Sequence, residues 1–116
     1  MVTVVTGFTQ KAIIKYIKNN FENTFTLGFP EEGRHPKYSC MLVDFTVSDH
    51  KQDDTVISTL SECIVNRIGY LIAKGVISEA NIIWLDENNE DHKCYYNERG
   101  NVKGWPFGFF IPSRIL

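Results

Sequence analysis

The feature that most constrains the fold is the N-terminal change from a strand pattern to a helix pattern within a few residues. Val2–Thr6 is short, apolar and β-branched, which predicts a strand. Gly7 ends it, and Thr9 can cap a helix that runs to about Phe21. The apolar positions of this helix share one side, at Ile13, Ile14, Ile17 and Phe21. A strand that leads directly into an amphipathic helix predicts helices packed on a sheet.

Short apolar runs recur further along the chain. Apolar and polar residues alternate most clearly over Met41–Ser48, so we expect a strand there. Residues 30–36 contain two prolines, a glycine and charged side chains, which predicts a loop. The other expected strands are Phe25–Phe29, Asn81–Leu85, Cys94–Tyr96 and Phe107–Ile111.

A second helix is expected to end near Lys74, because Gly75 supplies a C-terminal stop. Two alternatives are open for its start. One of the aspartates at 53–54 caps it, or residues 56–57 form a short strand and the helix begins after Ser58. The expected fold is therefore mixed, of the α+β class, with two main helices packed on one mixed or antiparallel sheet.

Composition limits the domain count and the environment. A chain of 116 residues, 43% hydrophobic and 22% charged, is expected to form one compact domain over residues 1–116. The net charge of −2 argues against a strongly basic nucleic-acid-binding surface, while a local basic patch stays open. No apolar run approaches the ~20 residues that cross a bilayer. The three cysteines without a CxxC pair, and an N-terminus without a secretion pattern, predict a soluble cytoplasmic protein.

The second half of the chain carries four short motifs in a specific order. They are a segment before a helix, an Asn-Arg-Ile helix, a Leu-Ile-Ala-x-Gly turn and a closing Trp-Pro-x-Gly-Phe-Phe motif. Their residues are Thr59, Ser61 and Glu62; Asn66, Arg67 and Ile68; Leu71, Ile72, Ala73 and Gly75; and Gly100, Trp105, Pro106, Gly108, Phe109 and Phe110. This half resembles the C-terminal region of ABC/SMC-like predicted bacterial ATPases, including relatives of the overcoming-lysogenisation-defect proteins of phage defence.

Departures from that family concern the nucleotide chemistry. The family's histidine near the terminal phosphate is Leu60 here, and the acidic residue after Phe-Phe is Ile111. No Gly-x-x-x-x-Gly-Lys-[Ser/Thr] loop is present, and only Gly7 precedes Lys11 in the nearest strand-turn-helix segment. No acidic pair follows an apolar strand to hold magnesium, and the nearest candidate, Asp44, stands alone. The resemblance therefore implies a relative without ATP hydrolysis, and we assign no catalytic or cofactor-binding residue.

Metal and covalent chemistry receive no assignment either. The three histidines and three cysteines are scattered, and the spacing of His92 and Cys94 is too close for most structural zinc sites. No nucleophile motif such as Gly-x-Ser-x-Gly occurs. We therefore expect no metal and no enzymatic activity.

Aromatic residues gather in the last quarter of the chain. Few lysines or arginines accompany them, so we expect them to pack on the domain's own core or to meet a protein rather than a nucleic acid. The function that we expect is non-enzymatic protein binding, with an ATPase or nuclease of a bacterial or phage conflict system as the partner. The expected interface residues are Trp105, Phe107 and Phe110, with Tyr95 or Tyr96 beside them.

An immunity or inhibitor protein is the alternative function. Residues 87–91 include three acidic side chains, Glu87, Glu90 and Asp91, which could face the basic active site of a toxin. The two hypotheses differ in the surface used: the aromatic terminus in the first and the acidic turn in the second. The sequence does not determine the oligomeric state.

Overall fold

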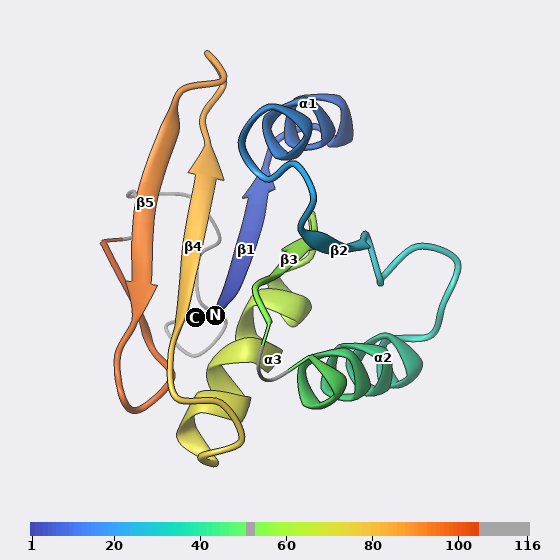
Figure 1. Cartoon of the computed structure of the whole chain (residues 1–116), viewed down its shortest axis with the longest axis vertical. Coiled ribbons are helices and arrows are strands. Elements are labelled where there is room, and N and C mark those ends of the chain that lie inside the picture. Colours follow the sequence, from blue (N-terminus) through green and yellow to red (C-terminus); the bar gives the residue numbers. More distant parts are fainter. Residues whose placement is uncertain (51–52, 105–116) are drawn as a thin grey trace, which may run out of the picture.

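Residues 1–50 and 53–104 are described by the computed structural model, and they form three helices on one six-stranded mixed sheet (Figure 1). This confirms the expected α+β class and selects the mixed sheet over the antiparallel one. The strands are β1 (Val2–Gly7), β2 (Phe25–Gly28), β3 (Thr55–Ser58), β4 (Ala80–Leu85), β5 (Asp91–Tyr96) and β6 (Val102–Lys103).

The sheet has the strand order β2-β3-β1-β4-β5-β6. The first four strands of this order are parallel, whereas β5 and β6 are antiparallel additions at one side. In β1, Val2–Val5 pairs with all of β3 and Val2–Gly7 with all of β4. The carboxyl ends of these strands therefore lie at one edge of the sheet.

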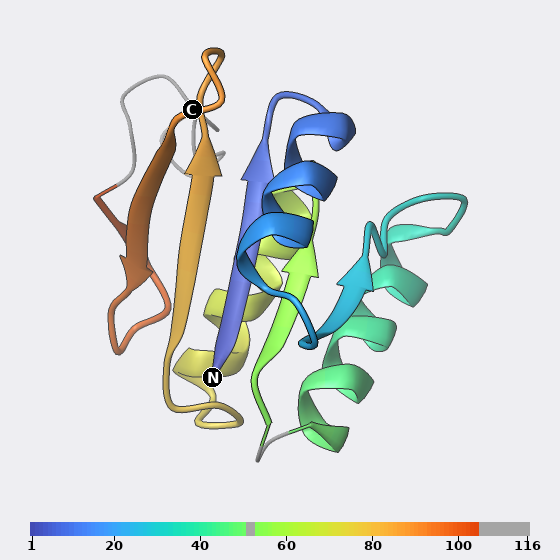
Figure 2. The same ribbon diagram turned by 45° about the horizontal axis from the view of Figure 1, so that its top comes forward.

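Both faces of the sheet are covered by helices, α1 (Gln10–Asn20) on one side and α2 (Pro36–Asp49) with α3 (Glu62–Ala73) on the other (Figure 2). Side chains alternate along β1: Val4 belongs to the core under α2 and α3, and Val5 to the core under α1. Both valines are completely buried. Strands that are apolar on both faces are what a two-sided helical cover requires.

The strand predicted at Met41–Ser48 is wrong, because this segment is part of α2. The buried side chains of α2 are Ser39, Val43, Thr46 and Val47, which follow the helical spacing of one face. The residues that the strand interpretation would place on one buried face include Met41 and Phe45, and both are exposed. Pro36 in the first turn and the His35 cap, whose ring nitrogen accepts from the Lys37 amide at 3.1 Å, start the helix.

The helix ends that carry capping residues agree with the sequence. The Thr9 hydroxyl accepts from the Ala12 amide at 3.2 Å and caps α1. The second alternative for the following region is confirmed, because β3 is a short strand and α3 begins after Ser61. Gly75 has φ +76°, the left-handed conformation of a helix stop.

The antiparallel side of the sheet is fastened to α3 by a close backbone contact. Gly100, in the turn between β5 and β6, has φ +80°, and a Cβ there would collide with the Gly69 carbonyl of α3. The Tyr96 hydroxyl donates to the Val65 carbonyl at 2.6 Å from a buried position. Burial also raises the pKa of this phenol far above its ordinary value. The first contact needs a glycine at position 69 of α3, whereas the second needs the tyrosine hydroxyl of β5.

Candidate functional site

The carboxyl edge of the parallel strands is the first place to look for a site. The neighbouring strands β1 and β3 lead into helices on opposite faces of the sheet, α1 and α3 (Figure 2). Open α/β sheets bind ligands outside the carboxyl ends of the strands at such a switch in direction. The segments that meet here are the turn after β1, the loop after β2 and the loop after β3.

Glu31 occupies this edge from within the chain. Its carboxylate accepts the Thr59 hydroxyl at 2.7 Å and the Leu60 amide at 2.9 Å. Thr59 is completely buried, and its hydroxyl oxygen in turn accepts the Ser61 amide at 2.9 Å. The loop that leads into α3 is thus organised around an internal carboxylate, whose charge opposes an incoming phosphate at the same place.

Two residues of the first motif of the ATPase resemblance, Thr59 and Ser61, lie in the same loop, whereas residues 66–68 and 71–73 are part of α3. Leu60, at the position where the resemblance implies a histidine, packs against the core under α1. The turn after β1 is tight, because a Cβ on Gly7 would lie 2.9 Å from the Leu85 carbonyl oxygen. Thr6 is fully buried, and its hydroxyl finds no hydrogen-bond partner among the described residues.

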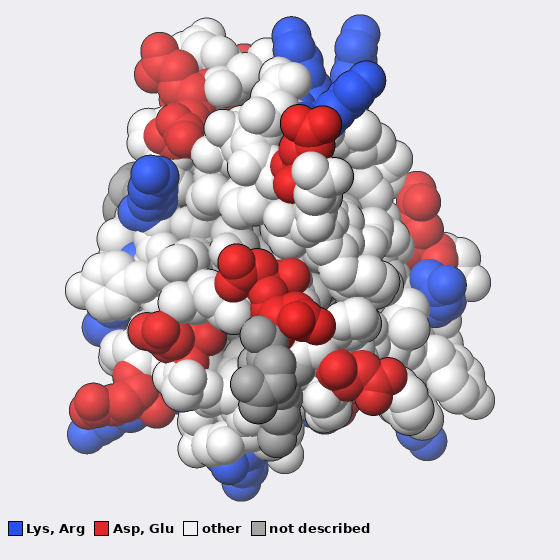
Figure 3. Space-filling view, viewed as in Figure 1, with Lys and Arg blue, Asp and Glu red and all other residues white. Residues whose placement is uncertain are grey.

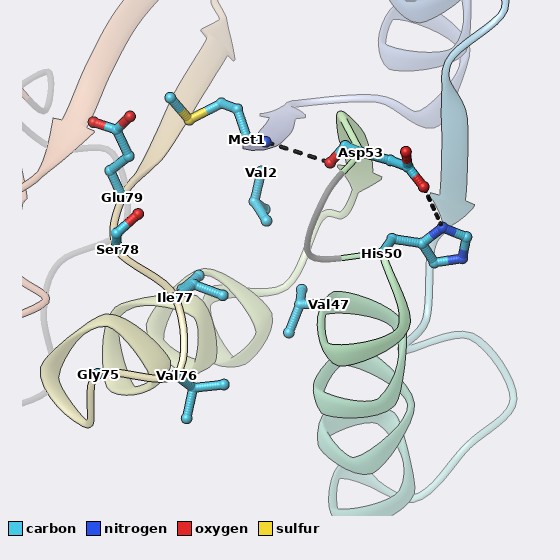
Figure 4. Close-up of a pocket in the computed structure, with 10 residues that line it drawn as sticks. All are labelled: Met1, Val2, Val47, His50, Asp53, Gly75, Val76, Ile77, Ser78 and Glu79. Atoms are coloured by element: carbon cyan, nitrogen blue, oxygen red, sulfur yellow. Dashed lines mark hydrogen bonds and ion pairs between the residues drawn. The ribbon is translucent and has the colours of Figure 1, made fainter.

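A cavity of about 430 Å³ lies at the opposite edge, near the amino ends of β1 and β4 (Figure 4). Its wall combines apolar side chains such as Val47 and Ile77 with His50, Asp53 and Glu79. His50 lies 3.8 Å from the Asp53 carboxylate and stacks on Phe25 with ring centroids 4.2 Å apart. The size suits a small ligand, but His50 and Asp53 already pair with each other.

The acidic turn between β4 and β5 is a third candidate, at the upper left of Figure 3. Asp86 organises it, accepting the amides of Asn88 at 2.8 Å and Glu90 at 2.9 Å while it pairs with His92 at 2.8 Å. The hydrogen bond from His92 is the main reason that the pKa of Asp86 is lowered. Glu87 and Glu90 are exposed.

The outer face of α2 carries an apolar ridge, which we define as Tyr38, Met41 and Phe45. Their exposed fractions are 61%, 55% and 70%. The spacing of three and four residues places them in one line along the helix. A shallow hollow of about 420 Å³ lies beside the ridge and is lined by Met41, Asp44, Phe45, Ser48 and Asp49. Figure 1 shows α2 at the outer side of the helical layer.

Charged and aromatic groups from α3 border this ridge. The Arg67 guanidinium donates to the Asp44 carboxylate from Nε at 2.9 Å and also from Nη2, a bidentate pair that joins α3 to α2. This pairing raises the pKa of Arg67. The same guanidinium lies 4.5 Å from the ring centroid of Tyr70, which is 46% exposed. The border of the ridge is therefore held in a defined geometry.

The predicted interface residues have different surroundings. Trp105, Phe107 and Phe110 lie outside the described residues. Tyr95 is 56% exposed on β5, whereas Tyr96 is buried against α3 and contributes to the core. Of the acidic residues, Glu87 and Glu90 are exposed on the turn, while Asp91 accepts the Tyr16 hydroxyl at 2.8 Å.

The ridge was not predicted from the sequence, because a strand assignment sends Met41 and Phe45 toward the core together with Val43. The pattern that could have found it is the helical spacing of the three ridge residues, preceded by Pro36 at a first-turn position. Glu31 was placed in a charged loop, and its two hydrogen bonds depend on the approach of β2 to β3.

None of the helices in residues 1–50 and 53–104 is both long and apolar enough to pass through a membrane. Comparisons with protein-family models, with curated proteins and with solved structures returned no match for this chain.

Proposed function

We propose that this chain is a protein-binding domain that acts without catalysis, and that it is an accessory or regulatory relative of a bacterial or phage defence ATPase. The observation that carries the proposal is the exposed ridge on α2. Tyr and Phe are favoured anchors at protein interfaces, and three large apolar side chains in one line are costly to leave in water.

The arrangement of the carboxyl edge supports the non-enzymatic part of the proposal. Glu31 fills the loop after β3 with a carboxylate, and Leu60 contributes an apolar side chain at the position where the family has a histidine. A nucleotide phosphate would meet like charge there. The ATPase resemblance then reflects common ancestry and a shared class of partner. The partner that it implies is an ATPase or nuclease.

The test is a comparison of two tagged full-length variants in the native host. Phe45→Glu places a charge on the ridge, whereas Ile14→Glu places the same charge on an exposed apolar position of α1, with an exposed fraction of 54%. We expect proteins captured by the wild type and by Ile14→Glu to be lost with Phe45→Glu, while circular dichroism shows both variants folded. Equal capture by both variants would refute binding through the ridge.

The acidic turn favours a second candidate, an immunity or inhibitor protein. Glu87 and Glu90 are exposed on a turn whose backbone Asp86 holds through two hydrogen bonds. Binding through these charges therefore requires little loss of backbone conformational entropy. Glu87→Lys with Glu90→Lys should abolish protection against a toxin if this candidate is right. Unchanged protection by that double variant would exclude the turn as the inhibitory surface.

A further inference from the structure

We propose that the ridge on α2 binds the ridge of a second copy of this chain, in an antiparallel pair related by a two-fold axis beside Met41. This inference rests on the proposed function, because it names the partner of the same surface. The ATPase or nuclease partner then binds the paired form through another surface and is lost when the pair is broken; Tyr95 and the acidic turn lie on the β4–β5 side, away from α2 (Figure 1).

The first argument is the spacing of the exposed residues. Tyr38, Met41, Phe45 and Ser48 are all exposed and are separated by three, four and three residues, which is the pattern of a helix seam that pairs with another helix. In a two-fold pair the same patch serves both copies. Met41 then faces its own counterpart, and Tyr38 of each copy enters the hollow beside Met41 and Phe45 of the other.

The second argument is charge, which selects the orientation. At 100° per residue, Lys37 and Asp44 flank one side of the seam and Asp49 flanks the other. An antiparallel two-fold pair brings like sides together, so that Lys37 of each copy lies beside Asp44 of the other. A parallel pair would instead set Asp44 beside Asp49 of the second copy, twice. Opposite charges favour the first arrangement and like charges oppose the second.

Arg67 strengthens this argument, because it fixes Asp44 in place. The bidentate pair holds the carboxylate at the border of the ridge, so little side-chain freedom is lost when a lysine of the second copy approaches. The Asp44 carboxylate would then lie between two cations, one from each copy.

The area indicates a reversible dimer. Exposed fractions of 55–70% on the three ridge residues leave roughly 100–170 Å² of each side chain to be covered. With the flanking side chains, two copies would bury on the order of 1,000 Å², at the low end of specific interfaces. We expect a dissociation constant on the order of 10–500 µM, so the experiment needs a wide range of concentrations.

Sedimentation equilibrium of the purified full chain, at concentrations up to about 1 mM, tests the pair directly. We expect the mass to rise from monomer to dimer, the Phe45→Glu variant to stay monomeric, and the Ile14→Glu variant to behave as wild type. Monomer mass at every concentration would overturn the inference, as would a dimer that Phe45→Glu leaves intact.

Charge variants test the orientation. Lys37→Glu should weaken the antiparallel dimer about tenfold, because it places two like-charge pairs in the interface. Asp49→Lys should change it by less than about twofold, since no charged residue of α2 in the second copy lies opposite. A parallel pair predicts the reverse, with Asp49→Lys tightening the dimer through the new lysine beside Asp44, and that result would overturn the antiparallel arrangement.

A disulfide test locates the axis. In a background with Cys40 and Cys63 replaced by serine, Met41→Cys should cross-link two copies under mild oxidation, whereas Ile14→Cys should not. Equal cross-linking of both variants would contradict a specific axis beside Met41. A monomeric chain that still loses its captured proteins through Phe45→Glu would refute the second copy and leave the proposed function intact.

Discussion

Replacing Glu31 should destabilise the domain far more than replacing its neighbour Glu32. The Glu31 carboxylate accepts two hydrogen bonds from the loop before α3, one of them from the buried Thr59. Hydrogen bonds to a charged group contribute roughly 1.5–3 kcal/mol each, and a buried donor left unpaired costs about 1–3 kcal/mol. Because the site is only partly buried, we expect Glu31→Ala to lower the free energy of unfolding by about 2–4 kcal/mol.

Two further variants separate the charge from the general loss of a side chain. Glu31→Gln keeps one acceptor oxygen and should lose about 1–2 kcal/mol, because its amide hydrogens face a donor. Glu32→Ala removes only an exposed bond from Gln10 at 2.7 Å and should lose less than about 0.5 kcal/mol. It is the matched control, since it makes the same change one residue away.

Urea unfolding followed by tryptophan fluorescence measures these differences. With a slope of about 1.5 kcal/mol per molar urea, Glu31→Ala should move the midpoint down by roughly 1.3–2.7 M. A Glu31→Ala midpoint that coincides with that of Glu32→Ala would refute the role of the internal carboxylate. The carboxyl edge would then be open to an external ligand, and the non-enzymatic proposal would lose its structural support.

Three other changes have defined outcomes. Gly100→Ala should cost about 2–4 kcal/mol, because it combines a left-handed φ with a collision against Gly69, and a thermal midpoint equal to wild type would contradict that contact. Tyr96→Phe should cost about 1–2 kcal/mol, since the buried hydroxyl donates to a helix carbonyl, and thermal unfolding measures this loss. Burial, followed by the hydrogen bond to Asp91, raises the pKa of Tyr16 to about 12, so its contribution to stability is fully present below pH ~10 and is lost as pH rises through about 12. An absorbance titration should show this phenol ionising at lower pH in Asp91→Asn, and an unchanged titration would show that the hydrogen bond has no influence.

Elements with strong local signals could be predicted from the sequence. The first strand and α1 follow from a β-branched run, Gly7 and the Thr9 cap, and the end of α3 follows from Gly75. These signals act over a few residues, so the chain needs no distant contact to express them. The mixed class follows from their order along the chain.

The candidate surfaces needed the three-dimensional structure. The alternation over Met41–Ser48 satisfies a strand pattern, but packing against α3 buries Val43 and Val47 on one helical face and leaves Met41 and Phe45 outside. Glu31 becomes an internal ligand only because β2 pairs with β3 and brings its loop beside Thr59.

The sequence by itself determined where the chain turns, caps and carries apolar runs, because those properties depend on neighbouring residues. The tertiary structure decided which apolar side chains are buried and which carboxylate is satisfied from within. Burial and pairing depend on segments that are distant in the sequence. For Phe45 the deciding neighbour is α3, whose packing fixes the face of α2 that remains in water.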